Sequence, residues 1–315
     1  GFYGHFRGRK TCPGRGAMSA STRLGFARLM LGTAQLGAAY GIANTTGQLS
    51  EAASTTLLDC AWENELTSFD TARLYGQSER RIGTWIAQTG HTPRLITKFR
   101  PVHTAAALRN SLDESFAVLG VNCVDGLLAH DARALSQRTI ADTLQDLQAQ
   151  GRIGSFGASV YEPEHAISLM AVPGLSLLQL PLNAFDNRFI ETGVLAKAAS
   201  RGISIFARSP LLQGVLVMTP ESLPSHLHVA RTPLRRFRDH ARAAGLTPSA
   251  LALAMVLARP EVTSMVIGAE LPIHINDAAL AATLTLEETV ISEAWQLAAN
   301  LPRAVVNPSL WPKTD

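Results

Sequence analysis

Eight short apolar segments alternate with stretches of helical periodicity along this 315-residue chain, and this alternation constrains the fold more than any other feature. Strands that alternate with helices are typical of β/α units in a parallel sheet, and eight such units close a barrel. The expected strands are Leu29–Gln35, Leu66–Thr71, Arg94–Phe99, Val124–His130, Gly154–Val160, Leu175–Leu182, Ile203–Ser209 and Thr263–Gly268.

The intervening stretches predict helices with recognisable ends. Ser50 and Ser78 are expected N-caps, because a serine hydroxyl accepts a hydrogen bond from a free amide of the first turn, and a further helix is expected after Ser136. Gly151 is expected just past a helix, where the backbone turns left-handed. Pro248–Arg259 is almost entirely Ala, Leu, Met and Val, so we expect it to pack between the barrel wall and a neighbour.

An open, doubly wound sheet would show the same alternation of strands and helices. Its first strand typically leads into G-x-G-x-x-G, and no such motif follows Leu29–Gln35. We therefore predict an α/β fold, a (β/α)8 TIM barrel, in a single domain over residues 21–315. Two long connections, Leu212–Pro233 and the stretch from Leu301, break the rhythm, and the first is expected to lie across the barrel mouth.

Basic residues are concentrated at the N-terminus. The chain has a net charge of +3, and Arg7, Arg9, Lys10 and Arg15 more than account for it, so the charge gives no case for nucleic-acid binding. We expect residues 1–20 to be a disordered basic extension, because they lack the apolar segment of a secretory signal. No apolar run approaches the ~20 residues that span a bilayer, so no membrane association is expected.

Cysteine and histidine usage suggests neither a disulfide framework nor a metal centre. Cys12, Cys60 and Cys123 share no C-x-x-C spacing, and a reducing compartment, the cytoplasm, is the expected location. A metal-dependent hydrolase would rest on His226 and His228, but no acid lies at ligand spacing from them. They are expected to be exposed loop residues, and no metal is expected.

Four chemically active side chains lie at or just past the ends of expected strands, namely Asp70, Tyr75, Lys98 and His130. Strand C-termini open on one face of a parallel barrel, so these residues are expected to converge there. An acid, a phenol, an amine and an imidazole together suggest proton transfer coupled to carbonyl chemistry. Singly, each has an ordinary structural reading as a turn residue, a rim aromatic, a solvated charge or an interior histidine.

The motifs around these residues resemble those of the aldo-keto reductases. LGTAQLG (Leu31–Gly37) is similar to the first-strand signature of that family, FDTARLYGQSE (Phe69–Glu79) to its Asp-Thr-Ala block, and LQAQGRIGSFGAS (Leu147–Ser159) to a later segment. The blocks occur in the family's order, and the resemblance extends from Arg23 to Trp311. It implies a (β/α)8 barrel that uses NAD(P)H to interconvert an aldehyde or ketone with its alcohol, in either direction.

The resemblance also implies a role for each of the four residues. Tyr75 would protonate the carbonyl oxygen as hydride arrives, and Lys98 would stabilise the resulting phenolate. Asp70 would keep Lys98 in its charged form and orient its ammonium group, and His130 would orient the substrate oxygen. A neutral tyrosine, with an ordinary pKa of ~10, needs such a cation to act as an acid near pH 7.

Cofactor contacts follow from the same resemblance. Ser159 and Gln179 match positions that hold the nicotinamide carboxamide, although the asparagine that usually follows the serine is Val160 here. The segment FARSPLLQG (Phe206–Gly214) resembles a region that takes the pyrophosphate. The full expected cofactor-binding set is Gly32, Thr33, Ser159, Gln179, Ser209, Leu211, Gln213, Gly214, Gly268, Ala269 and His274.

The adenosine end departs most from the family pattern. Where a Lys or Arg often meets the 2′-phosphate, this chain has Gly268, Glu270, His274 and Ala278. Glu270 would repel a 2′-phosphate but could accept from a ribose hydroxyl. Both NADP(H) and NAD(H) therefore remain open as cofactors.

Two function classes are weighed against each other. The first is an oxidoreductase for a small carbonyl or alcohol substrate, with a sugar-like compound suggested because GTAQLGAAYGIANTTGQLS resembles a bacterial branch of the family. The alternative is a nicotinamide-binding regulatory or redox-sensing subunit without significant turnover. The intact set of Asp70, Tyr75, Lys98 and His130 favours the enzyme. Substrate identity and oligomeric state are left open.

Overall fold

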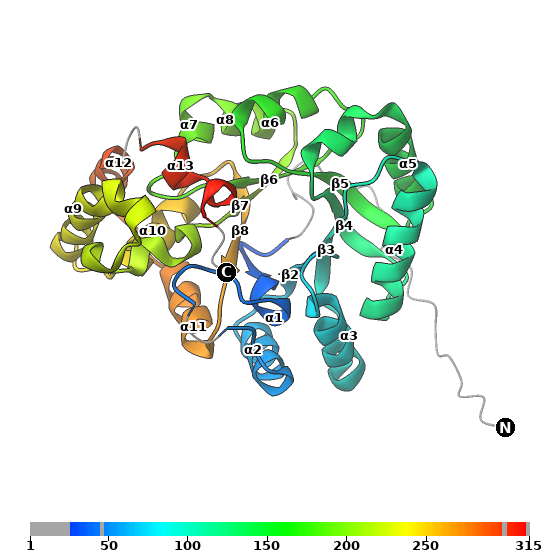
Figure 1. The fold of residues 1–315 in the computed structure, drawn as a ribbon, viewed down its shortest axis with the longest axis horizontal. Helices are drawn as coiled ribbons and strands as arrows, with labels where there is room; N and C mark the ends of the chain where they lie inside the picture. The colour runs from blue at the N-terminus through cyan, green and yellow to red at the C-terminus, as the bar shows by residue number, and fades with distance from the viewer. Residues whose placement is uncertain (1–25, 45–46, 298–300, 313–315) are drawn as a thin grey trace.

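Eight parallel strands close into a barrel in the computed structural model, which describes residues 26–44, 47–297 and 301–312 (Figure 1). The strands follow one another around the barrel, and the first pairs with the last, Leu29 opposite Met265. The predicted (β/α)8 fold is confirmed. The expected N-terminal extension lies outside the described residues. The strands are β1 (Leu29–Gly32), β2 (Ser68–Asp70), β3 (Arg94–Phe99), β4 (Val124–Ala129), β5 (Ile153–Ser159), β6 (Leu177–Pro181), β7 (Ser204–Arg208) and β8 (Val262–Gly268).

Helices form a ring around the barrel, with short helices in the connections (Figure 1). The α-helices are α1 (Ala34–Gly37), α2 (Glu51–Glu63), α3 (Ser78–Thr89), α4 (Ala105–Leu119), α5 (Arg138–Ala149), α6 (Pro163–Leu169), α7 (Arg188–Glu191), α8 (Val194–Ser200), α9 (Arg231–Ala243), α10 (Pro248–Leu257), α11 (Pro272–Ala281), α12 (Glu288–Gln296) and α13 (Arg303–Val306). The 3₁₀ helices are η1 (Ala132–Ser136), η2 (Leu212–Val217), η3 (Pro220–Ser222), η4 (Ser225–Ala230) and η5 (Pro308–Leu310).

Two apolar layers hold the barrel together, because successive strand residues point alternately inward and toward the helices. The inner layer is a small buried cluster from six strands, namely Met30, Ile96, Leu128, Leu177, Phe206 and Val266. Phe26 packs edge-on against Phe206, with ring centroids 5.1 Å apart. The outer layer joins strands to helices in one continuous core. Burial on both faces explains why the strands are nearly continuous apolar runs in the sequence.

Helix ends confirm part of the sequence analysis and correct another part. The Ser50 side chain caps α2 by accepting from the Ala53 amide at 3.1 Å, and Gly151 follows α5 with φ +69°. The expectation for Ser78 is wrong, because Ser78 is already helical and its hydroxyl bonds the Thr33 hydroxyl at 2.7 Å. The helix expected after Ser136 is α5, which begins at Arg138, and Ser136 itself ends the separate helix η1.

The long connection after β7 is more ordered than the sequence suggested. It folds as η2, η3 and η4, and α9 already begins at Arg231. The apolar stretch Pro248–Leu257 forms α10, which is buried against β8, α9 and α11 as expected. The strands expected at Leu29–Gln35 and Leu66–Thr71 are shorter, because Thr33 turns the chain into α1 and its amide bonds Asp70 O at 2.9 Å.

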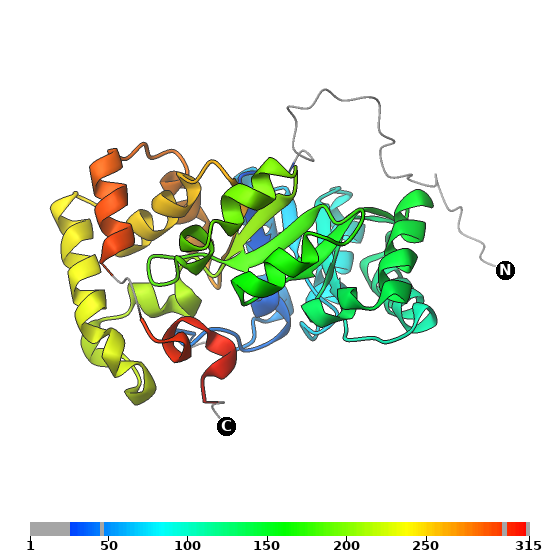
Figure 2. The ribbon, with the colours of Figure 1, turned by 90° about the horizontal axis from the view of Figure 1, so that it is seen from above.

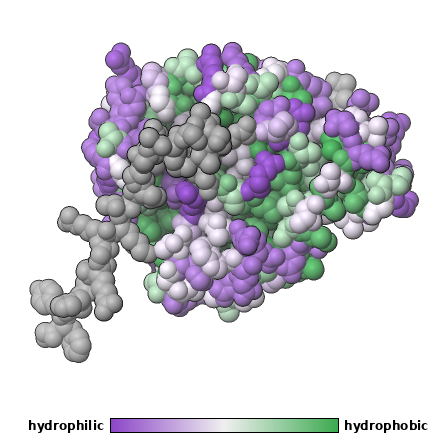
Figure 3. Space-filling view, turned by 180° about the vertical axis from the view of Figure 1, so that it is seen from behind, coloured by the Kyte–Doolittle hydropathy of each residue, from purple (hydrophilic) through white to green (hydrophobic). Residues whose placement is uncertain are grey.

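The C-terminal segment lies at one face of the barrel, as Figure 2 shows for α13. There α13 contacts η4, which belongs to the connection after β7, so this face carries the C-terminal ends of the strands. Hydrophilic and hydrophobic residues are mixed on the opposite face (Figure 3). Among the residues that the structure describes, no helix combines the length and hydrophobicity needed to cross a membrane.

Candidate active site

A buried ion pair lies at the C-terminal ends of two neighbouring strands. Lys98 of β3 is 1% exposed, and its Nζ lies 2.8 and 2.7 Å from the two carboxylate oxygens of Asp70 at the end of β2. Lys98 also donates to Thr71 O at 3.0 Å. Burial lowers the pKa of Lys98, and the Asp70 charge opposes this. Gln179 of β6 donates to Asp70 Oδ1 at 2.8 Å, which fixes the carboxylate from a third strand.

Tyr75 follows β2 in a turn that brings its phenol to this pair. The phenol oxygen lies 3.4 Å from Lys98 Nζ, and the ammonium lies 4.9 Å from the ring centroid. Two glycines allow the turn to pack against α1. A Cβ on Gly37 would lie 1.6 Å from Tyr75 O, and Gly76 has φ +51°. Burial and, next, the charge of Asp70 raise the pKa of Tyr75, whereas Arg208 lowers it.

His130 comes directly after β4 and completes the predicted group of four. Its ring is edge-on to that of Tyr75, with centroids 5.8 Å apart and an interplanar angle of 87°. Its Nδ1 is buried and has no hydrogen-bond partner among the described residues. Burial, followed by the charges of Lys98 and Arg208, lowers the pKa of His130 to about 4. The imidazole is therefore neutral at physiological pH and carries one N–H donor.

A cavity of about 560 Å³ extends from this group to the start of α11. Asp70 and Tyr75 line it, whereas Lys98 lies behind Asp70, and His130 reaches the group beside the Tyr75 ring. Nine of the expected cofactor-binding residues also line the cavity: Gly32, Thr33, Gln179, Ser209, Leu211, Gln213, Gly214, Gly268 and His274. Ser159 and Ala269 are buried and do not line it.

The turn after β7 has an unusual backbone along one wall of the cavity. Ser209, Leu212, Gln213 and Gly214 have φ of +57°, +48°, +53° and +96°. Such conformations cost non-glycine residues of order 1–3 kcal/mol each and cluster at ligand sites. A right-handed residue followed by a left-handed one, as at Leu211 (φ −103°) and Leu212, turns successive backbone amides toward one side, which suits phosphate oxygens. This turn is the segment from which sequence analysis expected pyrophosphate contacts.

The far end of the cavity is acidic. Glu270 and Asp277 line it near α11, and His274 Nδ1 accepts from the Glu270 amide at 3.3 Å. Within the described part of the chain, Arg208 is the sole Lys or Arg among the residues that line the cavity. Gly268 leaves room there, because a Cβ on it would lie 2.5 Å from Gln35 Nε2.

Several lining residues are absent from the sequence-based set, and three of them carry polar or charged groups that bear on ligand binding: Tyr40, Arg208 and Asp277. Arg208 stands inside the FARSPLLQG segment, so its place in that motif was a usable signal. Asp277 lies one residue before Ala278 on α11, within the segment IGAELPIHINDA that the family resemblance assigns to the adenosine end, so its position was an equally usable signal. The sequence around Tyr40 gave a weaker signal for a place in the cavity. In the structure its phenol oxygen lies 3.4 Å from Gln213 Nε2.

The two loop histidines lie outside this cavity. His228 is exposed, as expected, and its Nε2 lies 2.8 Å from Arg231 Nη2. His226 is half-buried rather than exposed, because η4 turns it toward the C-terminal segment, where its ring centroid lies 5.8 Å from that of Trp311. Across the described ranges, no three His, Cys, Asp or Glu side chains are gathered in a way that could hold a metal ion.

Comparison with known proteins agrees with this geometry. The model of the Aldo/keto reductase family matches residues 28–298. "Aldo-keto reductase str7" of Strobilurus tenacellus is 27% identical over 211 residues, which are 63% of this chain and 60% of that protein. "Uncharacterized oxidoreductase YrpG" of Bacillus subtilis is 25% identical over 313 residues, covering 86% of this chain and 91% of its own length.

A solved structure shows the same fold. The crystal structure of PA4992 from Pseudomonas aeruginosa is 20% identical, with a TM-score of 0.63, and the match covers 82% of this chain and 90% of that one. The family match spans all eight strands and every residue of the predicted group of four. The chain therefore belongs to the aldo/keto reductase family of NAD(P)-dependent oxidoreductases.

Proposed function

We propose that this protein interconverts an aldehyde or ketone with its alcohol, with Tyr75 as the general acid and base. The observation that carries the proposal is the position of the phenol, 3.4 Å from a buried ammonium and at the wall of a cavity large enough for a ligand. A buried phenol beside a cation is suited to give a proton to a carbonyl oxygen.

The residues that line the cavity fit a dinucleotide. The left-handed turn from Ser209 to Gly214 would hold the pyrophosphate, and Gly32, Gln179 and Gly268 would border the two ends of the cofactor. When bound, the nicotinamide supplies hydride to the carbonyl carbon or removes it from the alcohol. At the acidic far end, Glu270 and Asp277 favour a ribose hydroxyl over a 2′-phosphate, so we infer a preference for NAD(H).

Proton transfer falls to Tyr75 and its neighbours. The phenol is protonated at neutral pH, but its raised pKa makes it a poor acid unless a cation assists it. Lys98 stabilises the phenolate that remains, and Asp70 keeps the ammonium charged although burial disfavours that charge. His130, neutral above its pKa of about 4, offers an N–H donor that can orient the substrate oxygen.

A direct test compares wild type with Tyr75→Phe on 4-nitrobenzaldehyde, with NADH and then NADPH. Loss of the phenolic proton should lower kcat/KM by about 10²- to 10⁴-fold, the usual contribution of a general acid. Fluorescence titration should show that the variant still binds the cofactor. Unchanged turnover in Tyr75→Phe would remove the assigned acid. Cofactor binding by wild type without turnover of any aldehyde would favour the redox-sensing alternative.

A further inference from the structure

A positively charged side chain shares the cavity with the proposed catalytic phenol. Arg208 is the last residue of β7 and lines the cavity together with Asp70 and Tyr75. It stands two residues after Phe206, which belongs to the inner barrel core. Because the strand period is two, both side chains face the barrel interior, with Arg208 at the mouth.

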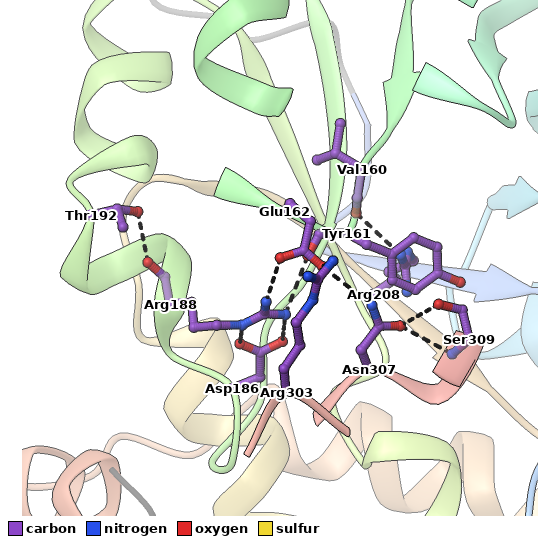
Figure 4. Close-up of polar contacts among 10 residues, drawn as sticks. All are labelled: Val160, Tyr161, Glu162, Asp186, Arg188, Thr192, Arg208, Arg303, Asn307 and Ser309. Carbon is purple, nitrogen blue, oxygen red and sulfur yellow. Dashed lines mark hydrogen bonds and ion pairs between the residues drawn. The ribbon is translucent and has the colours of Figure 1, made fainter. Parts of the chain in front are cut away.

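The guanidinium of Arg208 is held in place from two sides (Figure 4). Its Cζ lies 4.1 Å from the ring centroid of Tyr161, and Nη2 donates to Val160 O at 3.2 Å. The next residue, Glu162, accepts from Arg188 and from Arg303, each at 2.9 Å. This network fixes the loop that carries Tyr161, so the guanidinium rests on a rigid support.

Arg208 makes few polar contacts for a half-buried arginine. Among the residues that the structure describes, no carboxylate lies within 4.0 Å of it, whereas Arg73, Arg188 and Arg259 each have an acid within 2.8 Å. A guanidinium carries five N–H donors, and the bonds of Arg208 to described residues are one to Val160 O and a long one, 3.5 Å, to Ser209 Oγ. Donors therefore remain for a ligand.

The charges around the phenol leave a net positive charge. Lys98 and Asp70 form an ion pair and cancel each other, and His130 is neutral at physiological pH. The positive charge of Arg208 has no carboxylate partner within 4.0 Å among the described residues, and it lowers the pKa of Tyr75, Lys98 and His130. The acids that line the cavity beyond Asp70 lie at the other end, near α11.

We propose that Arg208 binds a carboxylate carried by the carbonyl substrate, so that oxo acids or acidic sugars are the substrate class. This inference rests on the proposed oxidoreductase function and specifies its substrate. The planar guanidinium matches a carboxylate through two parallel hydrogen bonds, which a lysine cannot provide. A rigidly held arginine adds specificity at little cost in side-chain ordering.

The test uses matched pairs of aldehydes that differ in one charge: 4-carboxybenzaldehyde with methyl 4-formylbenzoate, and the corresponding 3-isomers. In at least one of the two isomer pairs, wild type should show a kcat/KM for the acid that is roughly tenfold or more above that for the ester, as expected for a charge-assisted bond. In Arg208→Gln the ratio should fall to about one, and Arg208→Lys should keep part of it. Arg201→Gln is the matched control, because Arg201 donates to Met170 O away from the cavity and should leave the ratio at the wild-type value.

A second measurement does not depend on turnover. With NADH present, benzoate should raise the Tm of wild type more than benzamide does, and this difference should vanish in Arg208→Gln. Equal treatment of acid and ester by wild type, or equal stabilisation by benzoate and benzamide, would overturn the proposal. So would a loss of about tenfold in NADH affinity in Arg208→Gln with the acid-to-ester ratio retained, because the arginine would then hold the cofactor. Failure of wild type to reduce any aldehyde would instead count against the proposed function, and the benzoate comparison would still decide the role of Arg208.

Discussion

Burial shifts the pKa of several ionisable residues in this site. Lys98 is almost completely buried and depends on the two oxygens of Asp70 for its charge. Burial, followed by the charges of Lys98 and Arg208, lowers the pKa of His130, and the charge of Asp131 opposes this shift. Substituting Asp70 would therefore leave an uncompensated buried ammonium, whereas substituting His130 should relieve an electrostatic cost at low pH.

The depressed pKa of His130 makes the stability of the folded protein depend on pH. The unfolded histidine binds a proton near pH ~6.5, but the folded one does so only near pH 4, so stability is lost as the pH falls from about 6.5 toward 4. Between pH 7 and pH 5 the loss from this residue should be about 2 kcal/mol, at ~1.36 kcal/mol per unit of pKa. Urea unfolding at the two pH values should show a smaller difference for His130→Gln than for wild type. His165→Gln, at an exposed position on α6, is the control. If the free energy of unfolding changed equally between the two pH values in all three proteins, the assignment would be contradicted.

At the scale of elements, the cavity depends on how β7 and β8 end. The turn after β7 places Gly214 against the loop that follows α1, where a Cβ would lie 2.4 Å from Ala43 Cβ. The first residues of α11 bring Glu270 and His274 together at the opposite end. These two connections set the length and the charge of the cavity, and the strands supply its fixed wall.

Gly214→Ala tests the crowding at the β7 turn. The substitution adds a Cβ at φ +96° and forces the turn away from Ala43, so cofactor affinity should fall roughly tenfold and stability by about 1–3 kcal/mol. Gly245→Ala is the matched control, since Gly245 has φ +71° and open space around its Cβ position. It should lose about 1 kcal/mol in urea unfolding and keep full affinity for NADH in fluorescence titration. An equal loss of affinity in both variants would show that crowding at the turn is irrelevant.

Glu270 on the approach to α11 determines the charge that a 2′-phosphate would meet. Wild type should bind NADH roughly tenfold more tightly than NADPH, and Glu270→Lys should remove or reverse that preference, because the repulsion becomes attraction. Fluorescence titration of both cofactors measures the two dissociation constants. Glu288→Lys, an exposed change on α12, should leave their ratio unaltered. A wild-type preference for NADPH would contradict the inferred cofactor.

For the whole molecule, the sequence was sufficient to predict the barrel, the order of its strands and the convergence of Asp70, Tyr75 and Lys98. Apolar periodicity and family motifs both carry that information, because they are local in the chain. Contacts between distant segments were not predictable in this way. Ser78 has the sequence position of a helix N-cap, yet its hydroxyl forms hydrogen bonds with Thr33 and Thr71, the residues that follow β1 and β2. The stacking of Arg208 on Tyr161 likewise depends on how the end of β7 meets the loop after β5.

The network around Glu162 has a consequence for the last stretch of the chain. One carboxylate accepts hydrogen bonds from Arg188 after β6 and from Arg303 and Asn307 near the C-terminus (Figure 4). The residue beside it, Tyr161, supports Arg208 in the cavity. Sequence drift around Arg303 and Asn307 can therefore alter which compounds the site accepts although neither residue lines the cavity, and natural variants of this segment are a reservoir from which new selectivity could evolve.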